Sequence, residues 1–378
     1  MARVPSYAKT TALVSRALSC TPEGLVAAFV PATQADLAQV VELRKQVLGE
    51  QITWDDVRYL SWRYHFGSAE RGRGECWVVK RHNDVLAMVG SERLSVMHKG
   101  HSVDALSLMD IAVRPELDGV GLGVWVAMHL CERTQCVLAI GSNSHSRAIV
   151  SRVFVRLPDR RAYAHLLRFA PTLQRRWRSH SLAMVGAALA QAGMSLWRTA
   201  VSLTRVQSIR IEPLHRFDAS VDRLILQSRA EDTVSLSRDH VFLNWRLFDS
   251  PRSAYRVWGA YDADGLAGYL AARVQRQVDG TTALALEDFL VRAGNVGERA
   301  LKTILCHVLA HALDEGCERV TVIAYHHGNE RVLRRLGFFS LRADAETLSV
   351  RCQDPRLNES MSAGVSWHMT GANTDRDE

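Results

Sequence analysis

Lysine is scarce in this sequence, and the basic residues form no block. Five of the 47 basic residues are lysines, and the others are arginines scattered along a chain of 378 residues. The formal net charge of +7 is an excess that can attract a polyanion such as nucleic acid, a membrane surface or phosphate. Because the arginines do not gather in one stretch, we expect no nucleic-acid partner.

Paired cysteines and an apolar leader are also missing. The seven cysteines are odd in number, form no C-x-x-C pair and have no histidine nearby at metal-ligand spacing. We therefore expect no metal site, and free thiols in a reducing compartment. The first 20 residues, MARVPSYAKTTALVSRALSC, sustain no long apolar run, so a cleaved secretory signal is not expected. Both features indicate a cytoplasmic protein.

An internal repeat organises the chain, whose length favours two domains over one compact core. Three segments recur in the same order at an offset of roughly 180 residues. They are YLSWRYHFGS (59–68) with FLNWRLFDSP (242–251), NDVLAMV (83–89) with ADGLAGY (263–269), and DALSLMDIAVR (104–114) with TALALEDFLVR (282–292). The repeat predicts a duplicated domain.

Each copy has the pattern of an antiparallel meander that leads into a strand, helix, strand unit. In the first copy we expect a strand over 24–33, a helix over 34–48, a hairpin over 76–94, a strand over 105–113 and a helix over 124–134. This pattern predicts the α+β class (α/β three-layer), with a mixed sheet in each domain. We place the domains at 25–170 and 209–370, joined by a helical linker over 171–208.

The linker contains an uncharged amphipathic segment. Residues 181–197 carry no formal charge, and one stripe at helical spacing consists of Leu182, Val185, Leu189, Leu196 and Leu203. We expect a helix over 181–203 whose stripe packs on the two domains. Peripheral contact with a membrane surface is the second interpretation, since the basic run RRWR (175–178) precedes the helix. A membrane span is the third interpretation, because the uncharged segment is near the lower limit of the length that spans a bilayer.

The stretch VRPELDGVGLG (113–123) places glycine at every second position directly after the apolar run ALSLMDIAV. A glycine turn that opens a helix can bind phosphate through backbone N–H groups and the helix dipole. A P-loop ends in Gly-Lys-Ser or Gly-Lys-Thr, but Val124 follows Gly123, so nucleoside triphosphate hydrolysis is not expected. The spacing also differs from the G-x-G-x-x-G of dinucleotide folds.

The segment LSLMDIAVRPELDGVGLGVWVAMHL (106–130) resembles the strand, loop and helix that bind acyl-coenzyme A in the GNAT superfamily of N-acyltransferases. The residues that match the family pattern in spacing are Val113, Pro115, Gly119, Gly121 and Gly123. The resemblance covers nearly the whole chain as two tandem domains. The closing segment RVTVIAYHHGNERVLRRLGFF (319–339) is similar to the family's last strand and helix.

This resemblance implies a site for acetyl-CoA or another acyl-CoA. The backbone N–H groups that would hold the pyrophosphate belong to Gly119, Val120, Gly121, Leu122 and Gly123. The strand from Ile111 to Val113 would separate from its neighbour and bond the pantetheine arm. Asn143, which follows the next strand at a place where the family often has asparagine, is a further cofactor-binding candidate.

Two departures from the family pattern concern the phosphate loops. Asp118 occupies a place where the family usually has arginine or glutamine, so a carboxylate would lie beside the diphosphate. In the second copy, counting from Val291 puts Arg299 and Leu301 at the places of Gly121 and Gly123, and Glu298 intrudes as well. We therefore expect the second loop to be degenerate for the cofactor.

The catalytic candidates are Asp110 and Glu92. The family's usual acid, a tyrosine, has no counterpart, and the place of its base falls on Ser107, which cannot act as a base unaided. Asp110 lies on the cofactor strand, but Asp288 occupies the matching place in the second copy, so a structural role is at least as well supported. Trp62-Arg63 and Trp245-Arg246 recur in both copies, which favours a packing role.

The sequence therefore predicts a tandem N-acyltransferase that transfers an acyl group directly from acyl-CoA to an amine. The acceptor would be a small molecule or a glycan precursor such as an amino sugar, and no metal is needed. One alternative is a non-catalytic acyl-CoA sensor or scaffold protein, because persuasive acid and base candidates are missing. Another is an aminoacyl-tRNA-dependent transferase, although that activity needs no cradle for a CoA pyrophosphate.

Overall fold

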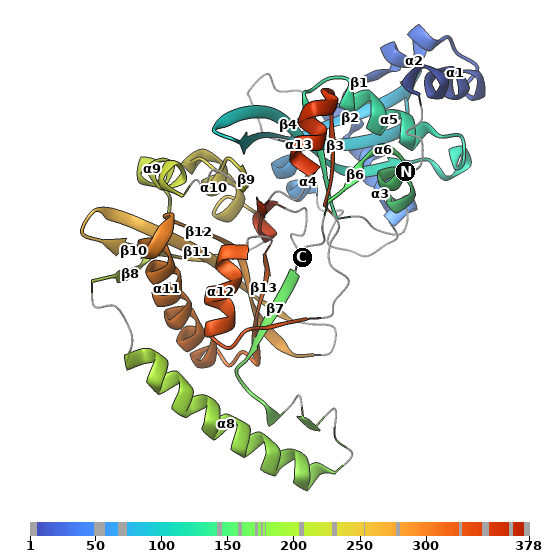
Figure 1. Cartoon of the computed structure of the whole chain (residues 1–378). Helices are drawn as coiled ribbons and strands as arrows, with labels where there is room; N and C mark the ends of the chain where they lie inside the picture. Colours follow the sequence, from blue (N-terminus) through green and yellow to red (C-terminus); the bar gives the residue numbers. More distant parts are fainter. Residues whose placement is uncertain are drawn as a thin grey trace.

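The chain forms two lobes, each built on a mixed β-sheet (Figure 1). This computed structural model describes residues 6–48, 57–66, 74–141, 146–157, 161–170, 173–174, 177, 179–203, 208–228, 233–252, 254–276, 280–324, 327–341, 348–362 and 366–373, without residue 253. Both sheets combine antiparallel pairs with one parallel pair along the main strand order, β4 with β5 and β12 with β13. The predicted α+β class with two mixed sheets is confirmed.

The first sheet has the strand order β1-β2-β3-β4-β5-β15-β6. Its strands are β1 (Phe29–Pro31), β2 (Gly74–Arg81), β3 (Asp84–His98), β4 (His101–Val113), β5 (Cys136–Ile140), β15 (Leu348–Cys352) and β6 (Val155–Arg156), with β9 (Thr233–Leu236) and β16 (Ser366–His368) attached beside β3. Its helices are α1 (Tyr7–Ala17), α2 (Pro22–Ala28), α3 (Leu37–Leu48), α4 (Val57–Arg63), α5 (Leu122–Cys131), α6 (Arg147–Val153) and α13 (Pro355–Ser362).

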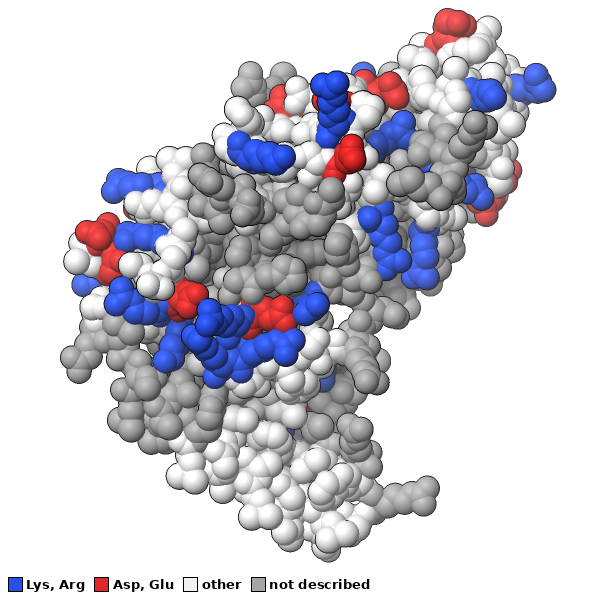
Figure 2. Space-filling view, viewed as in Figure 1, with Lys and Arg blue, Asp and Glu red and all other residues white. Residues whose placement is uncertain are grey.

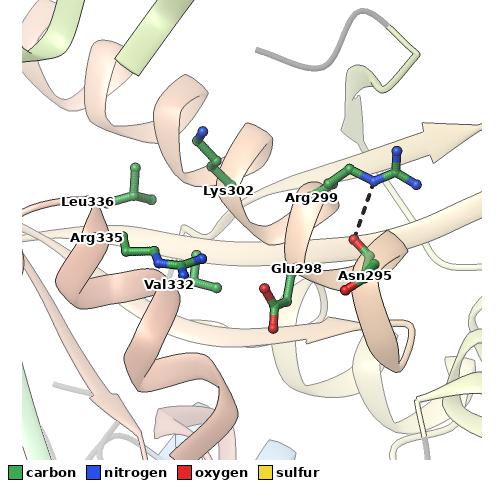
Figure 3. Close-up of a pocket in the computed structure, with 7 residues that line it drawn as sticks. All are labelled: Asn295, Glu298, Arg299, Lys302, Val332, Arg335 and Leu336. Atoms are coloured by element: carbon green, nitrogen blue, oxygen red, sulfur yellow. Dashed lines mark hydrogen bonds between the residues drawn. The ribbon is translucent and has the colours of Figure 1, made fainter. Parts of the chain in front are cut away.

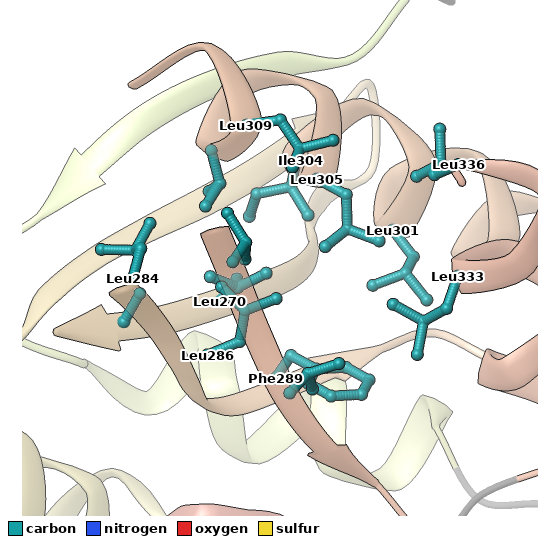
Figure 4. Packing of buried hydrophobic residues seen from close by; sticks show 14 of the residues in the cluster. Leu270, Leu284, Leu286, Phe289, Leu301, Ile304, Leu305, Leu309, Leu333 and Leu336 are labelled. Atoms are coloured by element: carbon teal, nitrogen blue, oxygen red, sulfur yellow. The ribbon is translucent and has the colours of Figure 1, made fainter. Parts of the chain in front are cut away.

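The second sheet has the strand order β14-β7-β13-β12-β11-β10-β8. Its strands are β14 (Phe339–Ser340), β7 (Arg161–Leu166), β13 (Arg319–Ala324), β12 (Thr282–Val291), β11 (Gly265–Arg276), β10 (Arg256–Asp262) and β8 (Arg210–Leu214). Its helices are α9 (Ala219–Gln227), α10 (His240–Leu247), α11 (Gly294–Asp314) and α12 (His327–Arg335). Figure 4 shows leucines of α11 and α12 packed against the apolar face of β11 and β12.

The two halves of the chain exchange strands: β7 of the first half enters the second sheet, and β9, β15 and β16 of the second half join the first sheet. β7 comes from the first half but lies between β13 and β14 of the second sheet, with Ala164 opposite Thr321. β15 comes from the second half but lies between β5 and β6 of the first sheet, with Val350 opposite Leu138. Each sheet therefore depends on hydrogen bonds from the other half, which the sequence repeat does not reveal.

The first half of the segment 24–33, predicted as a strand, is helical. Thr21 caps α2 by accepting a hydrogen bond from the N–H of Gly24 at 3.0 Å, and Pro22 occupies the first helical position. Only Phe29–Pro31 remains as strand β1, paired with β2. The apolar run alone resembles a strand, but the capping threonine and the proline that precede it favour a helix.

Helix α5 is buried on all sides because α1 and α2 cover its outer face. Trp125 of α5 donates a hydrogen bond from Nε1 to Oγ1 of Thr11 at 3.0 Å. The hydroxyl of Tyr7 lies 2.6 Å from Nδ1 of His129, one turn further along. A continuous apolar helix after the glycine turn is thus accommodated by N-terminal helices that stand outside the repeat.

The repeated Trp-Arg motifs join the two lobes. The rings of Trp62 and Trp245 stack with centroids 4.8 Å apart, and each of Arg63 and Arg246 lies over the tryptophan of the other copy. Arg246 also donates from Nε to the carbonyl oxygen of Ala372 at 3.1 Å. The predicted packing role of both motifs is confirmed.

The linker helix α8 (His180–Leu203) lies along one end of the molecule (Figure 1). The prediction that its leucine stripe packs on the two domains is wrong, since Leu189 is 71% exposed. The helix is held instead through small residues, with Ala183 and Ala187 buried. Among the described residues we find no helix with the length and hydropathy needed to cross a bilayer.

Cutting the chain between α8 and β8 should leave the two halves associated, because each sheet contains an interior strand of the other half. We would insert a protease recognition sequence there, cleave the folded protein and follow the fragments by size-exclusion chromatography. We expect co-elution in buffer and separation in urea. Separate elution of the folded fragments in buffer would contradict the strand exchange.

Candidate functional site

Strand β4 carries a bulge at Asp110, just before its end. Asp110 has a φ of 47°, and the register with β3 shifts between Met88 and Gly90. The parallel pairing of β4 with β5 extends only from Ala105 to Leu108, although β4 continues to Val113. β5 itself ends at Ile140, so Ile111 and Val113, which are half-buried, lie on β4 beyond its pairing with β5. The separation that the resemblance implies for a pantetheine arm stays a prediction.

The three glycines of the loop meet two different needs. Gly119 and Gly121 have φ of +78° and +92°, a region that side chains other than glycine rarely adopt. Gly123 has helical backbone, but a Cβ there would lie 2.8 Å from Cδ1 of Ile149 on α6. Gly119 and Gly121 therefore form the turn, and Gly123 lets α5 approach α6.

The turn is open at its first half and covered at its second. Gly119 is exposed and no atom lies within 4 Å of a Cβ built on it. Val120 and Gly121 are half-buried, whereas Leu122 and Gly123 are buried. Of the five residues assigned to pyrophosphate binding, the first three are therefore exposed or half-buried, although the N–H of Val120 already donates to the carbonyl oxygen of Leu117 at 3.3 Å.

The start of α5 offers unpaired N–H groups of its own. Gly121 is the N-cap and supplies no side-chain cap, while the first backbone bond of the helix runs from Trp125 N–H to the Gly121 oxygen at 2.9 Å. The N–H groups in the first turn of any α-helix lack a partner within the helix, and the helix dipole favours an anion there. Asp118 is exposed beside this turn and opposes an anion. Asn143 lies outside the described residues.

Asp110 is committed to buried partners. Its side chain is 8% exposed, lies 2.5 Å from Nη1 of Arg44 and accepts a hydrogen bond from the hydroxyl of Tyr64. Burial alone would raise the pKa of Asp110, but the charge of Arg44 and the two hydrogen bonds outweigh it and lower the pKa. A carboxylate held in this way stays ionised and fixes the bulge, which favours the structural interpretation.

The second copy repeats this arrangement with residues from other places. Asp288, buried in β12, accepts hydrogen bonds from Arg238 at 2.6 Å, Tyr269 at 2.8 Å and Thr370 at 2.7 Å. Tyr64 directly follows α4, whereas Tyr269 lies in the middle of β11. The repeat alignment could not find these partners, because the two copies deliver the phenol and the guanidinium from different elements.

Glu92 faces the motif that joins the two lobes. It is buried on β3, and one carboxylate oxygen lies 3.6 Å from Nη2 of Arg63. The same Arg63 nitrogen lies 2.6 Å from Sδ of Met109, next to the bulge. Glu92 therefore sits between the bulge and the lobe interface and interacts with a buried cation.

The second copy has a shorter loop and a cavity in place of the glycine turn. Helix α11 begins at Gly294, directly after β12, so the assignment of Arg299 and Leu301 to loop positions is wrong. A cavity of about 530 Å³ lies between α11 and α12. It is lined by Asn295, Glu298, Arg299, Lys302, Val332, Arg335 and Leu336, and Figure 3 shows their arrangement. The described rim thus carries three cationic side chains and one carboxylate over an apolar floor.

Comparison with solved structures identifies the fold. The chain is similar to a GCN5-related N-acetyltransferase from Anabaena variabilis, with 13% identity and a TM-score of 0.59 over 86% of this chain and 72% of that chain. It is also similar to a conserved protein of unknown function from Enterococcus faecalis, described as a probable N-acyltransferase. The identity is 10% and the TM-score 0.55, over 86% of this chain and 71% of that chain. A third similar structure is N-myristoyltransferase from Saccharomyces cerevisiae with bound myristoyl-CoA. The identity is 11% and the TM-score 0.50, over 85% of this chain and 78% of that chain.

These neighbours place the chain in the structural class of GNAT-fold proteins, as the sequence predicted. The likeness extends over most of the chain and includes both lobes. No protein-family model and no curated protein matches the sequence. At identities of 10–14% the likeness establishes the fold, while the reaction has to be argued from the chain's own residues.

Replacing Asp110 with asparagine should lower the free energy of unfolding by about 3–5 kcal/mol near neutral pH, because the variant leaves the Arg44 charge buried and unpaired. The lowered pKa of Asp110 means that its contribution is present above the unfolded pKa of about 4 and is lost as pH falls through the folded pKa. Urea unfolding at several pH values should therefore show that the difference in free energy of unfolding between the variant and the wild type becomes smaller in acid.

Asp104→Asn is the matched control for this experiment, since Asp104 is exposed on the same strand. It should unfold like the wild type at every pH. Equal stability of the Asp110→Asn variant and the wild type at neutral pH would show that the bulge does not depend on the ion pair.

Proposed function

We propose that this protein is an acyl-CoA-dependent N-acyltransferase whose cofactor site is in the first lobe. The observation that carries the proposal is the open glycine turn at Gly119–Gly121, which follows the part of β4 that extends beyond its pairing with β5. The pyrophosphate would be held by the N–H groups of this turn and of the first turn of α5. The pantetheine arm would run past Ile111 and Val113, and bound acyl-CoA would supply the thioester.

The residues present fit such a ligand with one opposing feature. The space over Gly119 is free of other atoms, and Gly121 leaves the helix start uncapped, so a phosphate can reach backbone donors. Asp118 repels a diphosphate, at a cost of about 1 kcal/mol for exposed charges. Several N–H contacts and the helix dipole can outweigh a penalty of this size.

The acceptor we propose is an amine of low basicity, such as an amino sugar or another glycan precursor. The buried guanidinium of Arg44 lowers the pKa of Asp110, which makes this carboxylate a poor acceptor of a proton. Glu92 faces the buried guanidinium of Arg63. A weakly basic amine is partly unprotonated near neutral pH and so depends less on a strong general base. Direct attack on the thioester carbonyl then transfers the acyl group and releases CoA as the thiol.

Acetyl-CoA or a longer acyl-CoA should stabilise the wild type, and Gly119→Glu should abolish this effect by placing a carboxylate where the diphosphate binds. At roughly 100 times its Kd a ligand adds about 2.7 kcal/mol, which corresponds to a Tm increase of about 3 °C for a chain of this length. Differential scanning fluorimetry with acetyl-CoA, longer acyl-CoAs and free CoA measures this shift.

Gly100→Glu is the matched control, because Gly100 has the same φ of +78° and equally free surroundings but lies in the β3–β4 turn. It should retain the full shift. A parallel variant, Arg335→Glu, changes the cavity of the second copy. Loss of the shift in Arg335→Glu alone would move the cofactor site to that cavity, and no shift with any CoA would overturn the proposal.

Release of free CoA thiol should accompany turnover when acyl-CoA is mixed with an acceptor amine. We expect amino sugars to react faster than alkylamines of high basicity at neutral pH, and the rate with any amine to rise with pH as the ammonium loses its proton. A thiol reagent follows the reaction. Binding of acyl-CoA without thiol release over the whole amine panel would instead support a sensor.

A further inference from the structure

Exposed apolar side chains are concentrated on α8. Among the described residues thirteen large hydrophobic side chains are exposed, and five of them belong to this helix. They are Leu182 (63%), Met184 (44%), Val185 (58%), Leu189 (71%) and Leu196 (75%). Four of the five, all except Met184, are spaced so that they lie on one face of the helix. We call these four residues, Leu182, Val185, Leu189 and Leu196, the apolar stripe.

A different face of α8 attaches the helix to the protein. Ala183 and Ala187 are buried, and a Cβ on Gly186 would lie 2.9 Å from the ring of Trp177. The side chain of Gln174 also reaches Sδ of Met184 at 3.0 Å. The small residues thus face the protein, and the apolar stripe faces solvent.

The chain around α8 contains arginines and no acidic residue. Residues 181–197 are uncharged, and no Asp or Glu occurs from 160 to 211. RRWR (175–178) precedes the helix, and Arg198, Arg205 and Arg210 follow its uncharged part. Figure 2 shows almost no blue or red on the described atoms at the end of the molecule where Figure 1 places α8. The stripe is therefore an uncharged surface flanked in the sequence by positive charge.

We propose that α8 binds the surface of an anionic phospholipid bilayer. The helix is about 36 Å long, at 1.5 Å per residue for 24 residues, and would lie parallel to the membrane. The apolar stripe enters the boundary between headgroups and acyl chains, and the arginines on either side interact with the phosphate groups. This inference does not depend on the proposed acyl transfer.

Charge favours a bilayer over a second copy of the chain. If two α8 helices packed stripe to stripe, in either direction, their flanking arginines would face other arginines, with no acidic residue between 160 and 211 to pair with them. An anionic membrane provides the opposite charge at both ends of the helix. A fluid apolar phase also accepts a stripe of aliphatic side chains without a preformed recess.

The test is co-sedimentation of the full-length protein with phosphatidylcholine vesicles, with and without phosphatidylserine. We expect the wild type to pellet with the phosphatidylserine vesicles, less with neutral ones, and less at high salt. Leu189→Glu should reduce the bound fraction at least about tenfold, because a carboxylate replaces the most central residue of the stripe. Leu226→Glu, at a position 58% exposed on α9, is the matched control and should bind like the wild type.

Three outcomes would overturn the proposal. The wild type could stay in the supernatant with all vesicles, or the two variants could lose binding equally. Light scattering could also show a dimer that Leu189→Glu dissociates, which would assign the stripe to a second copy. Both variants should keep the thermal shift with acyl-CoA if the wild type shows one, so a failure here is distinguishable from a failure of the proposed function.

Discussion

The ion pair between Asp110 and Arg44 is the interaction on which the candidate site depends. Asp110 occupies the bulge of β4 with a φ of 47°, a conformation that requires support from its surroundings. Arg44 from α3 and Tyr64, directly after α4, supply that support and hold a carboxylate ionised in the interior. The bulge lies on the part of β4 that extends beyond its pairing with β5, and the glycine turn follows this strand.

The two copies solve the same problem with different residues. Asp288 marks the equivalent bulge, but its guanidinium comes from Arg238 before α10 and its phenol from Tyr269 on β11. The copies then differ after this strand. The first copy has an open glycine turn before α5, whereas in the second copy α11 begins soon after β12 and a cavity lies between α11 and α12. The contacts that hold Asp110 and Asp288 are therefore more alike in the two copies than the segments that follow these strands.

The exchange of β7 and β15 makes the two lobes one folding unit. Neither half of the chain contains all the strands of its own sheet. Each strand lies between two strands of the other lobe, and the stacked tryptophans Trp62 and Trp245 add a second contact. Helix α8 lies outside both sheets, in the connection between β7 and β8. Its apolar stripe makes no contribution to either sheet, so its composition is free to serve an external surface.

The sequence alone determined the mixed α+β class, the packing role of the Trp-Arg motifs and the glycine turn, and it predicts the duplicated domain. These features are encoded in local patterns, periodicity, repeats and glycine spacing, that are readable over a few residues. Only the tertiary structure decided the strand exchange, the partners of Asp110 and Asp288, the early start of α11 and the exposure of the leucine stripe. Each of these depends on residues far apart in the chain, and an antiparallel pair or a buried ion pair leaves no periodic signal in either of its segments.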